Sequence, residues 1–297
     1  MKMFNLQKNI DIAAAVNFDK VIDALNEKRD GDCNKGTFGT LCCVCGSYGM
    51  AGAAMMCGSA AVTAGAGLVK MLIPESIYPI CASSLWENIF VVLPASSEGT
   101  LRADDIEQIV SQANASTAAV IGCGMKVTDD TKAICEALIK KCERPIILDA
   151  DGLNCISSHT DILKERTAQT IITPHPGEMS RLCGTTVKDI QQDRQGAAED
   201  FAKEHGCIVV LKGVGTVITD GSDTFINPTG NGSLAKGGSG DVLAGLIGAL
   251  VCQGIKPLDA AAAGVYLHGF AADECVDKIA MSCVTARDII TAVKYIM

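Results

Sequence analysis

Residues 227–245 read NPTGNGSLAKGGSGDVLAG and lead from a glycine-rich segment into an apolar run. Six glycines fall in these nineteen positions, and Asp241 is the one acidic residue among them. The GGSG backbone is expected to point unpaired N–H groups outward at the start of a helix, where geometry and dipole favour an anion. The segment therefore predicts a phosphate or oxyanion site. A simple turn with Asp241 as helix cap is the alternative, although a cap does not require three glycines.

If an anion lies on these amides, Asp241 has a second use. A carboxylate beside a transferring phosphate can accept the proton of the attacking hydroxyl group, as a general base does in kinase-like reactions. Two better-known phosphate motifs are absent from the sequence. No GxxxxGK[ST] stretch occurs, and the glycines after residue 46 do not fit GxGxxG. A P-loop protein and a nicotinamide-dependent Rossmann dehydrogenase are therefore disfavoured.

Outward from this segment, apolar runs alternate with amphipathic runs along the chain. This alternation predicts an α/β fold with a mainly parallel central sheet and helices on both faces, in a single domain over residues 1–297. The expected strands are 40–46, 67–73, 117–122, 145–151, 170–178 (breaking at Pro174) and 207–213, followed by a hairpin of 215–220 and 223–228. The expected helices are 52–65, 103–113, 129–142, 187–206, 239–253, 258–276 and 285–296.

Glycines and polar residues gather directly after the predicted strands. In an open parallel sheet, ligands bind beyond the carboxyl ends of the strands. The stretches GSYGMAGAA, GCGMKVTDD, ADG, PHPGE and KG all follow a strand. Together with 227–245 they predict one cleft for a large ligand that carries phosphate.

Composition excludes several other classes. The net charge is −9, with lysines and arginines scattered, so no nucleic-acid partner is expected. The longest apolar stretch, 242–255, is too short to span a membrane, which needs about 20 residues. The first twenty residues carry charges throughout and lack the core of a signal peptide. A cytoplasmic location is expected.

The 15 cysteines do not form a recognisable sequence motif. Their number is odd and their spacing irregular, and the chain is too long for a small disulfide scaffold. Cys42 and Cys45 match CxxC, but no second pair or nearby histidine completes a zinc site. Consecutive strand residues also point to opposite faces, which separates Cys42 from Cys43. Most cysteines are therefore expected to act as small buried apolar residues.

Four stretches together resemble the ADP/ATP-dependent NAD(P)H-hydrate dehydratases of the ribokinase-like superfamily. They are 34–54, TPHPGEMSRL (173–182), LKGVGTVI (211–218) and NPTGNGSLAKGGSGDVLAGLIGALVCQG (227–254). The resemblance runs from about residue 30 to the end, and TPHPGE combined with GGSGDVLAG is its most specific part. GSGD alone would indicate only a ribokinase-like kinase.

The resemblance implies a lyase that repairs hydrated NADH or NADPH, with ADP or ATP as co-substrate and Mg²⁺ as cofactor. The ring hydroxyl is phosphorylated, and loss of phosphate restores the double bond. Asp241 would be the base, and Gly238, Ser239 and Gly240 the anion hole. Residues implied to contact the hydrate are Ala53, Gly124, His175 and Asp241. Residues implied to contact the nucleotide are Lys212, Gly213, Val214, Gly215, Thr216 and Gly240. No metal ligand is assigned.

Each assignment has a simpler structural alternative. His175 could only hydrogen-bond within a rigid turn, Lys212 could be a surface lysine, and Gly52 and Ala53 could serve helix packing. Glu178 is interpreted as an acid in the first turn of a helix, where the helix dipole favours negative charge, in preference to a metal ligand. Asp149 and Asp151 could orient water or metal, or Asp151 could begin a turn.

The sequence also departs from the family pattern. Asn34 stands where many relatives have histidine, which leaves a role for this side chain open. A partner epimerase is often fused at the N-terminus of the family, whereas only about 35 residues precede the first predicted strand, so a separate epimerase is expected. Relatives suggest a homo-oligomer, with a tetramer possible.

Two rival functions remain open. The first is a vitamin-precursor kinase of the hydroxyethylthiazole or hydroxymethylpyrimidine type, which would release a stable phosphorylated product. TPHPGE and the glycines after residue 46 favour the dehydratase. The second is a non-catalytic regulator that binds nucleotide, which the presence of Asp241 beside the GGSG loop disfavours.

Overall fold

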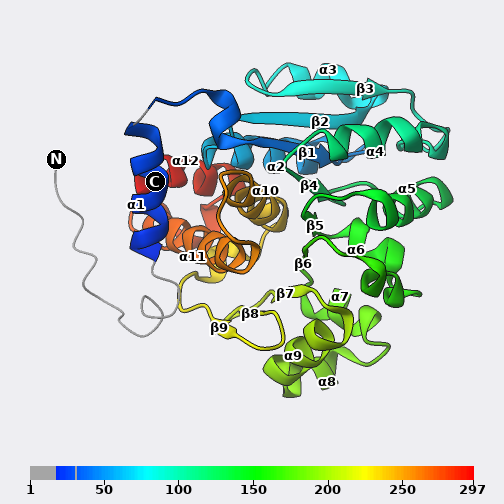
Figure 1. The fold of residues 1–297 in the computed structure, drawn as a ribbon. Coiled ribbons are helices and arrows are strands. Elements are labelled where there is room, and N and C mark those ends of the chain that lie inside the picture. Colours follow the sequence, from blue (N-terminus) through cyan, green and yellow to red (C-terminus); the bar gives the residue numbers. More distant parts are fainter. Residues whose placement is uncertain (1–17, 31) are drawn as a thin grey trace.

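The computed structural model describes residues 18–30 and 32–297 and contains one nine-stranded sheet (Figure 1). The strand order is β3-β2-β1-β4-β5-β6-β7-β8-β9. All pairs from β3 to β7 are parallel, and β8 and β9 add to the sheet antiparallel. The strands are β1 (Thr40–Val44), β2 (Leu68–Pro74), β3 (Ile89–Leu93), β4 (Ala118–Ile121), β5 (Ile146–Leu148), β6 (Thr170–Ile172), β7 (Ile208–Leu211), β8 (Val217–Thr219) and β9 (Thr224–Ile226).

Helices cover both faces of the sheet, as Figure 1 shows. One face packs against α1 (Phe18–Asp30), α2 (Ala51–Thr63), α10 (Ser239–Cys252), α11 (Pro257–Val276) and α12 (Ala286–Ile296). The other face packs against α4 (Ile106–Asn114), α5 (Asp129–Lys141), α6 (Asp151–Ile156), α7 (Pro176–Leu182), α8 (Val187–Gln192) and α9 (Arg194–His205). The short helix α3 (Tyr78–Ala82) lies beside β3. The predicted mainly parallel sheet with helices on both faces is confirmed.

The central strands are buried on both faces, which explains their continuous apolar sequences. Cys43 belongs to the core under α2 and α10, and Cys42 to the core on the opposite face, as strand alternation predicts. α10 approaches α2 closely because Gly245 has no side chain. A Cβ atom there would lie 2.3 Å from the backbone oxygen of Cys57. This contact fixes α10, and with it the glycine-rich loop before the helix.

Several predicted boundaries were wrong. The strand expected to break at Pro174 ends at Ile172, and α7 begins at Pro176, where the His175 side chain accepts the free amides of that helix. The helix expected over 187–206 is divided into α8 and α9, because Asp193 caps α9 and accepts the amide of Gly196 at 2.8 Å. The predicted hairpin of β8 and β9 is confirmed. The elements α1, α3, β3 and α6 were not predicted, whereas α7 has Glu178 in its first turn, as the preferred interpretation of that acid requires.

Two smaller predictions concern the N-terminal part and membranes. Asn34 caps the short 3-10 helix η1 (Lys35–Phe38) and accepts the amide of Gly36 at 2.8 Å, which is a structural use of this side chain. Across residues 18–30 and 32–297, none of the helices combines the length and apolar character needed to cross a bilayer.

Candidate active site

The glycine-rich segment before α10 is held in place along its whole length. Asp273 on α11 accepts the amide of Gly230 and the side-chain amide of Asn231, each at 2.8 Å. Lys236 donates to the backbone oxygens of Ser282 and Val284, each at 2.6 Å. These contacts hold the glycine-rich segment as a fixed platform at the N-terminus of α10.

Buried His268 supports this platform from below. The hydroxyl of Ser239 lies 3.2 Å from Nε2 of His268, which is on α11. Burial lowers the pKa of His268 from 6.5 to about 4, and nearby Lys212 adds to this effect. The ring is therefore neutral at neutral pH and adds no charge below the loop.

The amides of Gly238, Gly240 and Asp241 have no hydrogen-bond acceptor in the described part of the chain. This arrangement leaves donors at the first turn of α10, where the helix dipole also favours negative charge. Gly238 adopts a left-handed conformation with φ of 93°. A Cβ atom there would lie 3.2 Å from that of Ala286. The backbone can therefore form the anion-binding turn that the sequence predicted.

Asp241 lies beside a second carboxylate. Oxygen atoms of Asp241 and Asp149 and the sulfur of Cys123 lie within 4.8 Å of one another. Burial, followed by the Asp149 charge, raises the pKa of Asp241 from 3.8 to about 6, although Cys123 and Lys212 oppose this rise. A carboxylate of this pKa is ionised at neutral pH and is a better proton acceptor than an exposed aspartate.

Lys212 points into the site and is not a solvated surface lysine. Its ammonium lies 2.8 Å from Oδ1 of Asp149 and 3.7 Å from Oε2 of Glu178. Burial opposes its charge, but Asp149 and Glu178 outweigh this effect and keep the pKa of Lys212 above its ordinary value. Thr173 donates to the same oxygen of Asp149 at 2.7 Å. The result is a buried charge network under the first turn of α10.

The turn after β5 is strained at this point. Ala150 has φ of 48°, a conformation that residues with a side chain seldom adopt. It places Asp149 in the buried network and Asp151 at the start of α6, where Asp151 accepts the amide of Lys126 at 2.8 Å. Strain of this kind is often found at functional sites. Asp151 therefore does begin a helical turn, and Asp149 faces the site.

The segment KGVGT forms a tight loop between β7 and β8. Gly213 and Gly215 both have positive φ, and the hydroxyl of Thr216 donates to the Gly213 carbonyl at 3.0 Å. Val214 is fully exposed at the tip, although it is apolar. The loop reaches the α10 platform through Lys212, since a Cβ atom on Gly240 would lie 3.3 Å from Nζ of Lys212. The nucleotide segment predicted from the sequence is thus adjacent to the predicted anion hole.

Ala53 and Gly124 lie against each other, on α2 and on the loop after β4. A Cβ atom on Gly124 would lie 2.7 Å from that of Ala53. Ser47 holds this loop by donating to the Gly124 carbonyl at 2.8 Å. Gly52, in contrast, faces open space, so its lack of a side chain is not explained by packing. Two of the four residues predicted to contact the hydrate, Ala53 and Gly124, therefore share one small-residue surface.

His175 follows β6 and caps α7 with Nδ1, which accepts the amides of Gly177 and Glu178 at 3.0 and 3.2 Å. Glu178 returns the bond by accepting the His175 amide at 2.8 Å. Both residues thus have the local structural roles considered as alternatives. Glu178 also faces Lys212, which links this turn to the site. The contacts of the described residues do not join His175 directly to Ala53 or Gly124.

Sequence reasoning missed three contributors: His268, Asp273 and Cys123. His268 and Asp273 lie on an apolar helix. Their contacts with the glycine-rich loop become visible only in the folded structure. Asp149 was noted as a strand-end acid, but its pairing with Lys212 was not predicted. The position of Asp149 directly after a buried strand was, however, a signal in the sequence that it lies in the cleft.

Comparisons with known proteins identify the family of the chain. The model of a family described as NAD(P)H-hydrate dehydratase matches residues 41–294. The chain is 37% identical over 272 residues to a bifunctional NAD(P)H-hydrate repair enzyme, Nnr, of Moorella thermoacetica, covering 91% of this chain and 51% of the relative. It is 36% identical to an ADP-dependent (S)-NAD(P)H-hydrate dehydratase of Neisseria meningitidis, covering 82% of this chain and 80% of that relative.

A solved structure gives the same result. The ADP/ATP-dependent NAD(P)H-hydrate dehydratase of Bacillus subtilis, co-crystallized with ATP/Mg²⁺, matches with a TM-score of 0.78 and 31% identity, over 90% of this chain and 92% of that one. The chain spans about half the length of the bifunctional relatives that it matches. The fold is the predicted ribokinase-like α/β fold, and the chain belongs to the NAD(P)H-hydrate dehydratase family.

Proposed function

We propose that this protein dehydrates the hydrated form of NADH or NADPH, with ADP or ATP as co-substrate. The observation that carries the proposal is Asp241, a carboxylate with a pKa of about 6 beside the free amides of the α10 turn. Family membership and the relatives named above support the choice of substrate. The single sheet that runs through the described residues supports the prediction of one domain over 1–297.

In the proposed reaction, the terminal phosphate of the nucleotide lies on the free amides of Gly238 and Gly240 and beside Ser239, whose own amide donates to the Lys236 carbonyl at 3.3 Å. Asp241 accepts the proton of the ring hydroxyl group. The oxygen of that hydroxyl group attacks the terminal phosphorus of the nucleotide, and the shorter nucleotide leaves. Loss of the resulting phosphate, with a proton from the neighbouring ring carbon, restores the double bond. The products are NAD(P)H, inorganic phosphate and AMP or ADP.

The binding surfaces follow from the loops around the platform. Lys212, Gly213, Val214, Gly215 and Thr216 would contact the nucleotide, and exposed Val214 offers an apolar surface to a base. Ala53 and Gly124 would accept the flat nicotinamide ring, because neither carries a side chain beyond Cβ. His175, which is half exposed at the end of β6, is proposed to contact the hydrate.

Mg²⁺ fits the donors at this edge in part. Asp149 and Asp241 supply carboxylate oxygens, the ligand type that Mg²⁺ prefers, whereas the nearby thiol of Cys123 does not suit it. Such sites typically combine one or two carboxylates with the phosphates of the nucleotide. Mg²⁺ would therefore be held by Asp149 and by phosphate, and when bound it would neutralise phosphate charge, while Asp241 keeps its role as the base. A separate epimerase and a homo-oligomer remain proposals from the family resemblance.

The test is recovery of reduced-nicotinamide absorbance from NADH hydrate and NADPH hydrate, with ADP and with ATP in parallel. The expected result is recovery that depends on nucleotide, with release of one phosphate for each ring restored. A stable phosphorylated product from hydroxyethylthiazole or hydroxymethylpyrimidine, without absorbance recovery, would instead identify a vitamin-precursor kinase. Nucleotide binding with neither activity would identify a regulator.

A further inference from the structure

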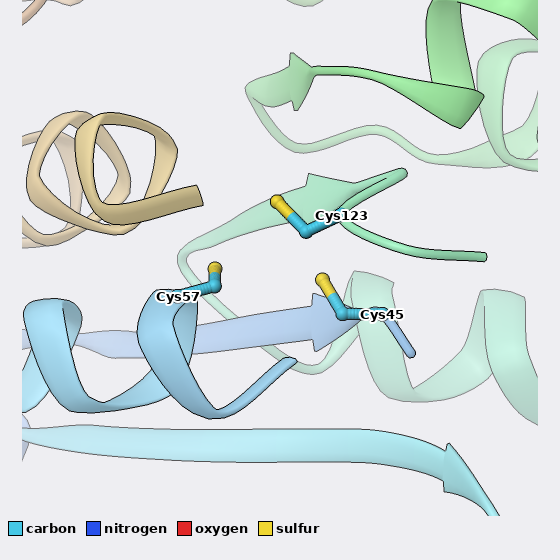
Figure 2. Close-up of side chains that lie close together, drawn as sticks. All are labelled: Cys45, Cys57 and Cys123. Carbon is cyan, nitrogen blue, oxygen red and sulfur yellow. The ribbon is translucent and has the colours of Figure 1, made fainter. Parts of the chain in front are cut away.

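Three cysteines that are distant in the sequence meet in the core, as Figure 2 shows. The sulfur atoms of Cys45, Cys57 and Cys123 all lie within 4.8 Å of one another. Cys45 follows β1, Cys57 lies on α2, and Cys123 lies in the loop after β4. Figure 2 shows the three side chains close together between these elements.

This cluster is not explained by the proposed reaction. Of the three sulfurs, that of Cys123 contacts the site, at 3.8 Å from Oδ2 of Asp149. All three side chains are fully buried, and none forms a disulfide. Three thiols at one point are more than apolar packing requires, because alanine or valine would fill the same space without reactive sulfur.

The geometry suits an atom bound by three sulfurs. Sulfurs bound at about 2.3 Å, as in zinc–thiolate sites, lie about 3.5–4 Å apart around the central atom. Because the sulfurs lie at most 4.8 Å apart, the cluster needs to contract by at most about 1.3 Å. A fourth sulfur is not in place: Cys43 lies 3.9 Å from the Cys57 sulfur, but it is not part of the group whose members all lie within 4.8 Å. Structural zinc sites are almost always four-coordinate, so this arrangement disfavours zinc.

The buried carboxylates beside the cluster limit which ligands the three thiols can bind. The cluster is buried next to the carboxylates of Asp149 and Asp241. Three thiolates around a monovalent or divalent cation would leave net negative charge there, and burying uncompensated charge is costly. A trivalent centre bound to three thiolates is neutral and avoids this cost. We propose that Cys45, Cys57 and Cys123 form a binding site for trivalent arsenic, taken up as neutral arsenous acid.

The binding reaction is balanced without an oxidant or reductant. Three S–H bonds and three As–OH bonds break, three As–S bonds form, and three water molecules leave. No charge is created at any stage between the neutral reactants and the neutral product. Because the thiols are fully buried, binding requires local opening and is expected to be slow compared with reaction at exposed cysteines.

Occupation would link the end of β1, helix α2 and the loop after β4. The same loop carries Gly124, and the same helix carries Ala53, so the proposed hydrate surface would lose freedom to adjust. Cys123 would also cease to face Asp149. Arsenic bound at this site is therefore expected to inhibit turnover, although binding itself does not depend on the proposed function.

The decisive experiment is arsenic X-ray absorption on the full-length reduced protein after incubation with one equivalent of sodium arsenite. Three sulfur neighbours and no oxygen neighbour are expected. Two sulfurs and one oxygen would overturn the proposal, because the arsenic would then occupy a pair of thiols. Native mass spectrometry in the same sample is expected to show one arsenic bound with loss of three hydrogens.

Single substitutions locate the site. Cys45→Ala, Cys57→Ala and Cys123→Ala should each weaken arsenite binding at least tenfold. Cys42→Ala is the matched control, because Cys42 is equally buried, on β1 three residues before Cys45, but faces the opposite core. Equal binding by the control and the three variants would overturn the assignment. Stoichiometric displacement of arsenite from these thiols by Zn²⁺ would also overturn the assignment, because the thiols would then form a cation site.

These measurements separate the site from the catalytic proposal. Binding is measured without hydrate or nucleotide, so inactivity of the protein in the recovery assay leaves it unaffected. Failure of arsenite to bind would, in turn, leave the role of Asp241 untouched. The absorption spectrum also uses the unaltered chain, so a substitution that prevents folding does not decide the outcome.

Discussion

The ammonium of Lys212 lies 2.8 Å from Oδ1 of Asp149, and this ion pair lies directly under the first turn of α10. Asp149 is fully buried, and the Lys212 side chain is one-fifth exposed. The pair joins the ends of β5 and β7, two strands that are not adjacent in the sheet. It sets the charge that Asp241 experiences, because Lys212 offsets part of the repulsion from Asp149.

Lys212→Met should destabilise the protein by about 3 kcal/mol, because it leaves the Asp149 carboxylate buried without its cation. Urea unfolding at neutral pH measures this change. Lys164→Met is the matched control, since Lys164 pairs with Asp161 at 2.7 Å on the exposed surface, and no measurable change is expected there. Similar losses of stability in both variants would show that the buried ion pair stabilises the protein no more than an exposed one.

Asp241→Asn should reduce turnover by on the order of 10²–10⁴-fold while nucleotide still binds, because the amide cannot accept the hydroxyl proton. In the unaltered protein, kcat should fall as the pH decreases through about 6, where the base becomes protonated. Steady-state rates from the hydrate assay, with calorimetry for ATP, test both statements. Turnover within threefold of the unaltered protein would exclude Asp241 as the base.

Asp241 is also expected to lower the free energy of unfolding at neutral pH. Its folded pKa of about 6 lies above the ordinary 3.8, so the folded state binds the proton more tightly than the unfolded state. Stability from this group is therefore highest at low pH and is lost as the pH rises from about 4 to about 6. A shift of this size corresponds to about 3 kcal/mol, reduced to about 2 by partial exposure.

Asp241→Asn should consequently be more stable than the unaltered protein above about pH 6, and the difference should vanish near pH 4. Urea unfolding at about pH 7.5 and about pH 4 gives the comparison. Asp220→Asn, on the exposed turn between β8 and β9, is a suitable control for loss of one negative charge. A variant that is less stable than the unaltered protein at neutral pH would contradict the raised pKa.

The sequence predicted much of this arrangement because burial left a clear pattern. Strands such as Ala118–Ile121 are apolar on both faces, so their position and the cleft at their ends follow from alternation with helices. β3 escaped this pattern because it is an edge strand, with Ile89 and Val92 each more than 40% exposed. The break at Asp193 escaped because a capping side chain, and not a change in hydrophobic period, divides the two helices.

Contacts between distant segments could not be predicted in the same way. Cys42 and Cys45, which match CxxC, belong to the two different cores of the molecule. The spacing of cysteines along the chain does not show, however, that Cys45, Cys57 and Cys123 meet. Asp149 and Lys212 are 63 residues apart, and only the fold brings them together.

Gly240→Val should weaken ATP binding and turnover together, by about tenfold or more in affinity. A Cβ atom at Gly240 would lie 3.3 Å from Nζ of Lys212 and 3.8 Å from Oδ2 of Asp149, so the larger side chain must project over the free amides. Calorimetry with ATP is the measurement. Gly237→Ala serves as control, because nothing lies within 4 Å of its Cβ position. Undiminished affinity in Gly240→Val would count against an anion site on this turn.

Gly124→Ala should raise the KM for the hydrate and leave the affinity for ATP unchanged. The added methyl would lie 2.7 Å from Cβ of Ala53 and 3.1 Å from Cβ of Met50, so the small-residue surface must open or shift. Gly124 also has φ of 68°, and alanine is strained in that conformation wherever it occurs. The measurement must therefore separate backbone strain from loss of the surface.

Gly184→Ala provides this separation. Gly184 has φ of 64°, close to that of Gly124, but nothing lies within 4 Å of its Cβ position. Both variants should lose about 1 kcal/mol of stability from backbone strain, with a further loss at Gly124 from crowding. Only Gly124→Ala should change the KM for the hydrate, because only this methyl enters the surface shared with Ala53. Equal KM values in the two variants would remove Gly124 from the hydrate surface and leave it a structural turn.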